Sequence, residues 1–295
     1  MGRGRGCDIL ILMEEFAFLK YPRTEHIEGS CLSGGDDASA QIPWRHLSGK
    51  FLVVEEKLDG SNSGLRFGPG KELLIQSRGH YLVGGGRERH FEQLKAWAGT
   101  HTQALWDVLG NRYVLFGEWM AAKHTVFYDD LPHLFFEFDI YDTKDKVFLD
   151  TATRRRMLQG TPVVSVPVLY LGSLGPNLKD LTSLVRHSLY KSTSWVDNLV
   201  VAASGLGLDP GRVLAESDGT DLSEGLYVKV EGGGVVSARY KWVRREFLQS
   251  IIEAPGGGVH WLDRPHVANQ LTPGVDLYAS ELNDVMVALR EGQVL

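Results

Sequence analysis

Strand-like segments joined by short turns limit what this chain can fold into more than any other feature. Residues 225–231 and 235–242 both have the composition of strands, and only the three glycines 232–234 separate them. Glycine readily adopts the backbone angles of tight turns, so this pair predicts a β-hairpin. Residues 51–57 and 63–67 are also separated by a short polar turn, and they predict a second hairpin.

Other segments extend this pattern without the regular strand-helix alternation of a doubly wound fold. Apolar residues recur at helical spacing in residues 88–110, and helices are also predicted at 151–159 and within 177–203. The sequence therefore predicts an α+β fold dominated by antiparallel strands. Its further strands are predicted at residues 72–77, 112–118, 134–142, 147–149 and 163–171.

The C-terminal part of the chain differs in composition from the rest. Residues 254–275 are rich in glycine and proline and predict a linker or a long loop. Residues 276–291 have apolar residues at helical spacing and predict a final helix. We therefore expect one large domain, residues 1–250, followed by a linker and a short helical segment, residues 251–295.

The composition is that of an ordinary globular protein, with 43% hydrophobic and 23% charged residues. No apolar run approaches the roughly 20 residues that span a bilayer. The apolar stretch near the N-terminus stops at Glu14 and Glu15 without a small-residue cleavage site, which argues against a signal peptide. Cys7 and Cys31 have no metal-type spacing, and a disulfide between them would be unusual in the cytosol. We expect a reduced, cytoplasmic protein.

The net charge of −6 is only a weak argument against a nucleic-acid partner, because binding depends on local patches. One basic cluster, Arg154 to Arg156, is of a type that usually forms a solvated helix face. The second cluster carries more weight because of the residues around it, and it consists of Arg239, Lys241, Arg244 and Arg245.

Lys57 lies in the segment most suggestive of chemistry, Glu56-Lys57-Leu58-Asp59-Gly60-Ser61-Asn62. Taken alone, this segment is a polar turn after a strand, and Lys57 could simply be solvated. Five further polar segments follow it in a fixed order, at strand ends or within strands. They are Gln76-Ser77-Arg78-Gly79, Phe116-Gly117-Glu118-Trp119, Phe136-Glu137-Phe138-Asp139-Ile140, Glu224-Gly225-Leu226-Tyr227-Val228-Lys229 and Arg239-Tyr240-Lys241.

Together these segments suit nucleotidyl transfer. A lysine can attack the α-phosphate of a nucleotide only when its amine is neutral, and burial or nearby cations lower a lysine pKa. Lys229, Arg239 and Lys241 would supply those cations and would neutralise phosphate charge in the transition state. Oxygen ligands for a hydrated magnesium ion would come from Asp59, Glu118 and Glu224.

Three further side chains could bind the nucleotide itself. Phe138 could stack on a purine, and Asn62 and Arg78 could hydrogen-bond ribose and phosphate oxygens. Each residue also has an ordinary structural interpretation. Phe138 lies in an aromatic run typical of a core, and Glu224 and Lys229 could form an exposed strand pair that contributes little. The functional interpretation rests on the whole set in order.

The ordered set resembles the motifs of the covalent nucleotidyltransferase superfamily, which contains DNA ligases, RNA ligases and mRNA capping enzymes. The match spans about residues 17–247. Within the superfamily the chain is most similar to the RNA ligase 2-like branch, because it has Asn62 two residues after Gly60 where DNA ligases and capping enzymes usually have arginine. Two further segments resemble that branch, namely Phe138-Asp139-Ile140 and Phe18-Leu19-Lys20-Tyr21-Pro22. Residues 117–132 resemble its bacterial members.

The chain departs from the branch at two places. Arg239 stands where the branch has the first of two lysines, which keeps the charge but changes the geometry. Only residues 242–295 follow Lys241, so we do not expect the full oligonucleotide-binding barrel that DNA ligases and capping enzymes place there. The short C-terminal part strengthens the RNA ligase interpretation and leaves open how the chain would hold a nicked duplex.

The resemblance implies a nucleotidyltransferase fold of antiparallel sheets flanked by helices, and an ATP-dependent RNA ligase that uses Mg²⁺ or Mn²⁺. Lys57 would form lysyl-AMP, AMP would pass to the 5′-phosphate end of an RNA, and a 3′-hydroxyl would then displace AMP and seal the strand. The implied catalytic residues are Lys57, Glu118, Glu224, Lys229 and Lys241. The implied nucleotide-binding residues are Glu56 and Phe138 at the adenine, with Asp59, Gly60, Asn62, Arg78, Asp139 and Arg239.

Other interpretations stay open at this stage. A DNA ligase or a GTP-using capping-type guanylyltransferase carries similar motifs. An adenylating subunit that needs a partner protein to bind RNA is a further alternative. A nucleotide or RNA binder without activity is disfavoured, because a pure binder needs no nucleophile.

Overall fold

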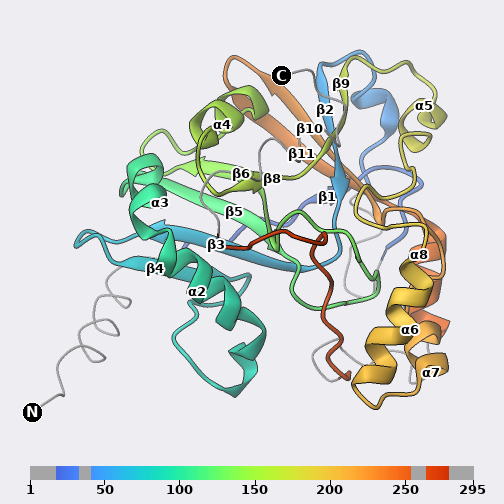
Figure 1. The fold of residues 1–295 in the computed structure, drawn as a ribbon. Helices are drawn as coiled ribbons and strands as arrows, with labels where there is room; N and C mark the ends of the chain where they lie inside the picture. Colours follow the sequence, from blue (N-terminus) through green and yellow to red (C-terminus); the bar gives the residue numbers. More distant parts are fainter. Residues whose placement is uncertain (1–17, 33–40, 254–263, 279–295) are drawn as a thin grey trace, which may run out of the picture.

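The computed structural model describes residues 18–32, 41–253 and 264–278. In this part of the chain eleven strands form one mostly antiparallel sheet, flanked by helices (Figure 1). The predicted α+β class is therefore confirmed. The strands are β1 (Glu25–His26), β2 (Leu52–Lys57), β3 (Ser61–Phe67), β4 (Leu73–Ser77), β5 (Tyr113–Trp119), β6 (Phe135–Asp142), β7 (Val147–Leu149), β8 (Val164–Ser165), β9 (Val168–Gly172), β10 (Gly225–Gly232) and β11 (Val235–Val243).

The order of the strands divides the sheet into two halves. The path runs β4-β3-β5-β6-β7-β11-β10-β2-β9, with β1 paired to β11 and β8 paired to β6. We call β4, β3, β5 and β6 the β3 half, and β11, β10, β2 and β9 the β2 half. The two halves run in clearly different directions in Figure 1, and the three-residue strand β7 joins them.

The two predicted hairpins have opposite outcomes. β10 and β11 pair antiparallel around Gly233 and Gly234, which both have positive φ values, so the first hairpin is confirmed. The second prediction is wrong, because β2 pairs with β10 and β9, whereas β3 pairs with β4 and β5. β2 is buried along nearly its whole length, and both of its edges are occupied by strands from distant parts of the chain. The turn after Lys57 therefore carries the chain from one half of the sheet to the other.

Helices cover both halves. The segment predicted as one helix at 88–110 consists of three pieces, with one boundary after Phe91 and another at His101. The strand predicted at 163–171 is split at Pro167, which has no N–H to donate to a strand. The helices are η2 (Trp44–His46), η3 (Gly86–Phe91), α2 (Glu92–Thr100), α3 (Thr102–Leu109), α4 (Thr151–Leu158), α5 (Leu178–Thr182), α6 (Trp195–Gly205), α7 (Pro210–Ala215) and α8 (Arg245–Glu253).

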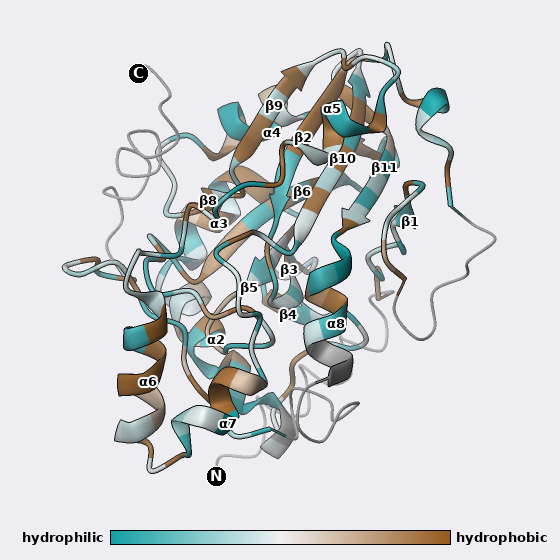
Figure 2. Ribbon diagram, turned by 90° about the vertical axis from the view of Figure 1, so that its right-hand side faces the viewer, coloured by the Kyte–Doolittle hydropathy of each residue, from teal (hydrophilic) through white to brown (hydrophobic). Residues whose placement is uncertain are grey.

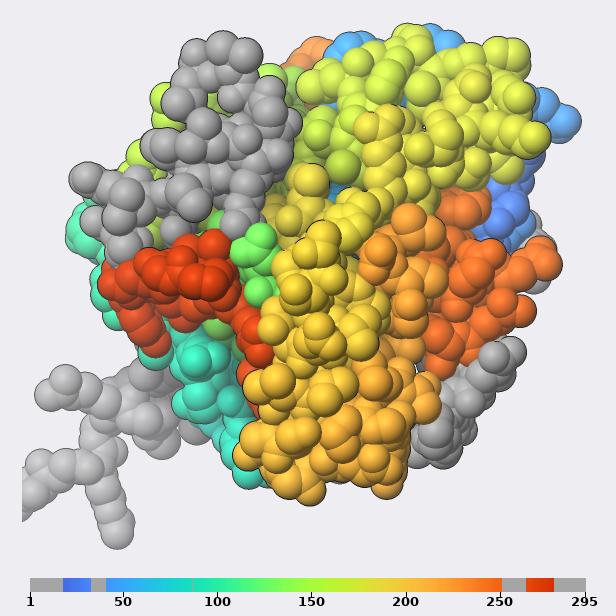
Figure 3. Space-filling model, turned by 45° about the vertical axis from the view of Figure 1, so that its right-hand side comes forward, coloured from blue at the N-terminus to red at the C-terminus, as the bar shows by residue number. Residues whose placement is uncertain are grey.

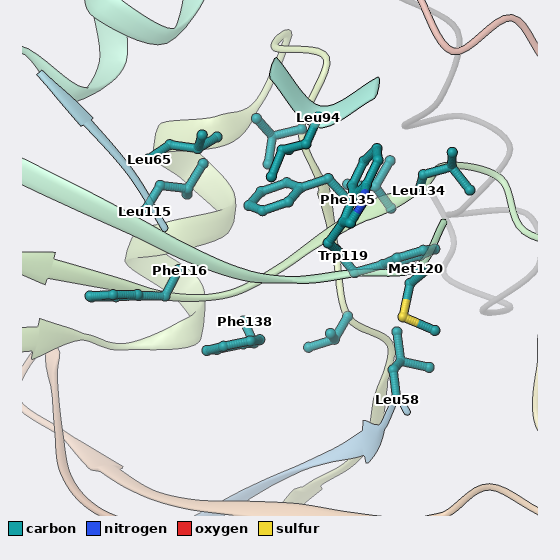
Figure 4. Close-up of a cluster of buried hydrophobic side chains, with 14 of the residues drawn as sticks. Leu58, Leu65, Leu94, Leu115, Phe116, Trp119, Met120, Leu134, Phe135 and Phe138 are labelled. Atoms are coloured by element: carbon teal, nitrogen blue, oxygen red, sulfur yellow. The ribbon is translucent and has the colours of Figure 1, made fainter. Parts of the chain in front are cut away.

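Three hydrophobic clusters hold these elements together. The largest lies around the β3 half, where Leu65 and Leu115 of the sheet and Leu94 of α2 gather with Phe135 (Figure 4). A second cluster lies on the β2 half, and a third joins α6 and α7 to Phe127. Figure 2 shows hydrophobic colouring along the strands, while α6 carries both hydrophobic and hydrophilic residues. Burial of these side chains is the main force that fixes the two halves.

Residues 264–278 pack against the body of the molecule. They form bridges from Ala268 to Ala122 and from Leu271 to Leu131, and the buried Asn269 accepts a hydrogen bond from the amide of Tyr128. Figure 3 shows this red segment lying between the teal helical region and the yellow α6 region. This part of the predicted linker is therefore a docked segment. The rest of the linker, most of the predicted helix at 276–291, and Cys7 with Glu14 and Glu15 lie outside the described residues.

No helix in the described ranges has the length and apolar character needed to cross a membrane.

Candidate active site

A pocket of about 580 Å³ lies where the two halves of the sheet separate. Lys57 reaches it from the end of β2, Glu118 from β5, and Lys241 from β11. The wall beyond Lys57 comes from the start of β3, the loop after β4 and the helix η3. The predicted site residues that line this pocket are Lys57, Gly60, Asn62, Arg78, Glu118 and Lys241.

Gly60 is required by a close approach of two backbones. A Cβ atom at this position would lie 2.7 Å from the carbonyl oxygen of Trp119 and 2.6 Å from the sulfur of Met120. The amide of Gly60 donates a hydrogen bond to the carboxylate of Glu118, at 3.1 Å. The glycine therefore lets the turn after Lys57 lie against the end of β5, and this contact brings Glu118 to the same pocket as Lys57.

Lys57 is held by a carboxylate. Its side chain is 16% exposed, and Nζ donates to Oε2 of Glu224 at 2.7 Å. Burial by itself lowers the pKa of Lys57, but the negative neighbours Glu224 and Glu118 outweigh burial and raise the pKa above its ordinary value. The predicted depression of this pKa by cations is therefore wrong, and Lys57 must lose its proton before it can act as a nucleophile.

The two carboxylates beside Lys57 carry raised pKa values. Burial raises the pKa of Glu118 to about 8 and that of Glu224 to about 7, although the ammonium of Lys57 lowers both. The negative charge of Glu224 also raises the pKa of Glu118, and the charge of Asp59 raises the pKa values of both carboxylates. Two poorly solvated carboxylates of this kind attract a cation strongly.

The fit of this pair to a divalent metal is partial. Within the described residues, no three His, Cys, Asp or Glu side chains are grouped closely enough to hold a metal ion. Mg²⁺, however, is commonly bound by one or two carboxylates together with waters and substrate phosphates. Glu118 and Glu224 therefore fit a metal that arrives with a nucleotide, and the predicted third ligand, Asp59, does not join them.

Asp59 faces the segment that follows β5. Its Oδ2 accepts hydrogen bonds from the amides of Thr125 and Val126, at 2.7 and 2.8 Å. Its Oδ1 lies 3.9 Å from Nδ1 of His124. These contacts fix the carboxylate against its own protein, so the prediction that Asp59 binds the metal and the nucleotide is not supported by the geometry.

Glu56 points to the opposite side of β2 from Lys57, as neighbouring residues of a strand must. Its carboxylate accepts a hydrogen bond from the hydroxyl of Ser188 at 2.5 Å, and only 2% of the residue is exposed. The prediction that its side chain faces adenine in this pocket is therefore wrong. Burial raises the pKa of Glu56 to about 7, although the Ser188 hydrogen bond lowers it.

Glu56→Gln is expected to change the pH dependence of stability. The pKa of Glu56 rises from 4.5 to about 7 on folding, so the folded protein binds the proton more tightly than the unfolded chain does. The contribution of Glu56 to the free energy of unfolding is therefore most favourable below pH 4.5, and this advantage is lost as the pH rises through 7. The uncharged glutamine removes this loss, so the variant gains about 3 kcal/mol relative to the wild type between pH 4 and pH 8.5. Urea unfolding at both pH values measures the gain. Glu28→Gln at an exposed position is the control, and equal pH slopes in all three proteins would contradict the assignment.

Lys229, Asp139 and Arg239 form a buried ionic network instead of lining the pocket. Nζ of Lys229 lies 3.2 Å from Oδ1 of Asp139 and 2.8 Å from Oε2 of Glu55, and it also donates to the carbonyl of Phe138. The guanidinium of Arg239 lies 3.1 Å from Oδ2 of Asp139. The charges of Lys229 and Arg239 are therefore neutralised within the protein. The geometry does not support the prediction that these two side chains contact phosphates, nor the prediction that Asp139 binds the nucleotide.

Two tyrosines provide the aromatic lining that was predicted for Phe138. Phe138 is only 4% exposed, and its ring packs against the rings of Tyr21 and Tyr227, with centroids 5.2 and 6.2 Å away. Tyr21 and Tyr227 themselves line the pocket, and the hydroxyl of Tyr21 donates to Asp139 at 2.5 Å. Both tyrosines lie in segments singled out in the sequence. Their position in those segments could have identified them as residues of the pocket.

The pocket has further lining residues that were not predicted as site residues, and they include Ser61, His80, Glu88 and His124. Ser61 lies inside the Lys57 segment, but His124 comes from the loop after β5, and its approach to Ser61 depends on how that loop folds back. The hydroxyl of Ser61 lies 3.3 Å from Nε2 of His124. No periodicity in the sequence indicates this contact.

Comparison with known proteins gives one family. The family model described as RNA ligase matches residues 50–243, which include Lys57 and Lys241. A search of the curated proteins finds no match to this chain.

Among solved structures, those of an RNA ligase from Naegleria gruberi are similar in part. A lysine-to-alanine mutant of that ligase with ATP and Mn is 18% identical, with a TM-score of 0.45, over 70% of this chain and 53% of that chain. A glutamate-to-alanine mutant with ATP and Mn is 17% identical, with a TM-score of 0.48, over 78% of this chain and 58% of that chain. The chain thus spans less than two thirds of the length of these structures.

Proposed function

The chain belongs to the RNA ligase family, and from this we propose that it is an ATP-dependent RNA ligase whose nucleophile is Lys57. One observation carries the proposal. The amine of Lys57 lies in a pocket, 2.7 Å from a carboxylate that can accept its proton, with a second carboxylate and the cation Lys241 around the same cavity. These are the groups that transfer of a nucleotidyl group to an amine requires.

In the first step Lys57 acts on the α-phosphate of ATP. The proton of its ammonium passes to Glu224, the nitrogen forms a bond to the α-phosphorus, and the bond to the pyrophosphate oxygen breaks. The negative neighbours of Lys57 raise its pKa and so keep it charged. A magnesium or manganese ion held by Glu118 and the phosphates would supply positive charge that favours the neutral amine and the developing phosphate charge.

The remaining lining residues suit the rest of the nucleotide. Lys241 and Arg78 place positive charge at the pocket, where phosphate oxygens can accept hydrogen bonds from them. Asn62 offers an amide to ribose or phosphate oxygens. Tyr21 and Tyr227 offer aromatic surfaces to the base.

The proposed partner is RNA with a 5′-phosphate end and a 3′-hydroxyl end. In the second step AMP passes from Lys57 to the 5′-phosphate, and in the third the 3′-hydroxyl displaces AMP. We propose that residues 1–250 contain the nucleotidyltransferase domain. The RNA ligase 2-like branch, a partner subunit for RNA binding and a cytoplasmic location stay predictions.

The test uses the whole chain with radiolabelled ATP or GTP and a denaturing gel. We expect label on the protein from ATP with magnesium or manganese. Addition of a nicked RNA duplex is expected to release the label and to give sealed strands. Label from GTP alone, or sealing of DNA nicks and not RNA nicks, would overturn the proposal. Label without sealing of any RNA would indicate an adenylating subunit instead.

Glu224→Gln is expected to slow lysyl-AMP formation by about 100-fold or more, because the amide cannot accept the proton of Lys57. Its oxygen still accepts the hydrogen bond, and Glu118 still balances the ammonium, so the free energy of unfolding is expected to change by about 1 kcal/mol or less. Label transfer and urea unfolding measure the two effects, with Glu28→Gln as the control. A wild-type rate, or a variant that does not fold, would contradict the assigned role.

A further inference from the structure

Ser61, His124 and Asp59 lie next to one another beside the pocket. The hydroxyl of Ser61 is 3.3 Å from Nε2 of His124, and Nδ1 of the same ring is 3.9 Å from Oδ1 of Asp59. Ser61 and His124 line the pocket, whereas Asp59 lies behind them. The order of hydroxyl, imidazole and carboxylate is the one that prepares an imidazole to accept a proton.

Backbone amides hold the carboxylate of Asp59 in place. Oδ2 of Asp59 accepts the amides of Thr125 and Val126, and the amide of Asp59 donates to the hydroxyl of Tyr128. Oδ1 is therefore left to face the imidazole. His124 is itself held in place, with only 7% of the residue exposed.

Asp59 acts on the imidazole through its charge. Its Oδ1 lies 3.9 Å from Nδ1, which is longer than a hydrogen bond, and a negative charge on this side of the ring favours the tautomer with the proton on Nδ1. The lone pair of Nε2 then points toward Ser61 and the pocket. Protonation of Nε2 would give an imidazolium stabilised by Asp59, as in other imidazole-carboxylate pairs.

The proposed reaction has three nucleophiles, and two of them need no further base. The amine of Lys57 already has Glu224 as its proton acceptor. The 5′-phosphate that attacks lysyl-AMP is largely deprotonated at neutral pH, because the second pKa of a phosphate monoester is about 6. Only the 3′-hydroxyl of RNA still needs a group that takes its proton.

We propose that His124 is the general base for the 3′-hydroxyl in the sealing step, oriented by Asp59; this rests on the proposed RNA ligase function. The 3′-hydroxyl of the RNA replaces the hydroxyl of Ser61 as the hydrogen-bond partner of Nε2 of His124. Its oxygen forms a bond to the 5′-phosphorus, the bond from that phosphorus to AMP breaks, AMP leaves with the electron pair, and the proton moves to His124. Asp59 is a positioning residue, because it does not touch the substrate.

Several charged groups lie around His124. Asp59 faces it from the turn after β2, and Lys123 precedes it in the chain. The other charged groups around the same pocket are Lys57, Glu118, Arg78, Glu88 and Lys241. Because carboxylates titrate in this pocket too, the test compares pH profiles of the variant and the wild type on one partial reaction.

The experiment measures sealing of a nicked RNA duplex whose 5′ end already carries AMP, so that Lys57 chemistry is bypassed. His124→Gln is compared with the wild type between pH 5.5 and pH 9, and lysyl-AMP formation is measured in parallel. His46→Gln, at an exposed position on η2, is the matched control. Ser61→Ala tests the placement of the hydroxyl without removing the base.

We expect His124→Gln to slow sealing by about 100-fold or more, and at least 30-fold more than it slows lysyl-AMP formation, on the scale of general base catalysis. The wild-type rate should rise with pH across the range of a histidine, and the variant should lose that rise. Imidazole in the buffer should restore part of the rate of His124→Ala. Ser61→Ala should keep the pH profile.

Two results would overturn the inference. One is equal loss of both partial reactions with no imidazole rescue, which would indicate a structural role for His124. The other is sealing at the wild-type rate with an unchanged pH profile. Failure of the wild type itself to seal the adenylated RNA would instead refute the proposed function.

Discussion

Lys57→Ala is expected to lose label transfer from ATP by at least about 10⁴-fold, because the variant has no amine in reach of the α-phosphate. The fold is expected to survive. Glu118 and Glu224 already have pKa values of about 8 and 7, so they can take up protons when the ammonium is removed. Label transfer on a denaturing gel and thermal unfolding at pH 6 measure the two effects.

Two controls sharpen this result. Lys57→Arg keeps a cation beside Glu224 but cannot supply a neutral amine, so it should be as inactive as Lys57→Ala. Lys50→Ala removes an exposed lysine near the start of the same strand and should leave label transfer unchanged. Covalent AMP on Lys57→Ala would sink the assignment of the nucleophile.

Arg154→Met is expected to lower the free energy of unfolding by about 3 kcal/mol or more. The guanidinium lies 2.5 Å from Glu137 and 2.8 Å from Glu55, and each of the three side chains is at most 1% exposed. Removing the cation leaves Glu137 buried without its ion pair, and an unpaired buried charge is strongly destabilising. Urea unfolding at pH 7.5 measures the loss.

Arg156→Met is the matched control for this prediction. Arg156 belongs to the same triple-arginine run of α4 but is exposed, so its loss should change the free energy of unfolding by about 0.5 kcal/mol or less. The sequence predicted a solvated helix face for the whole run, and for Arg154 that prediction is wrong. Equal effects of the two substitutions would contradict the role assigned to the buried network.

The order of the polar segments predicted much of the candidate site. Four separate segments contribute to one pocket, which is lined by Lys57, Asn62, Arg78, Glu118 and Lys241. Each lies at a strand end or in the turn next to it, or on the strand β11. Because such positions gather along the edge of a sheet, the order of the segments was enough to bring them together.

Other site residues could not be placed from the sequence. The role of a charged side chain depends on which groups the fold packs against it, and these are not visible in the sequence. Lys229 and Asp139 look as suitable for phosphate chemistry as Lys241 does. In the interior, Lys229 forms ion pairs with Asp139 and Glu55, and these pairs neutralise its charge. The same holds for Glu56, whose side of the strand faces Ser188 and not the pocket.

The sequence by itself determined the α+β class, the β10–β11 hairpin and the candidate nucleophile, since these depend on local pattern and on residue types in a fixed order. The tertiary structure decided which strands flank β2, which carboxylates face Lys57, and whether its amine is charged at rest. The physical reason is that strand pairing and pKa depend on groups far apart in the chain. Lys57 and Glu224 are separated by 167 positions, yet their contact sets the protonation state from which the proposed reaction begins.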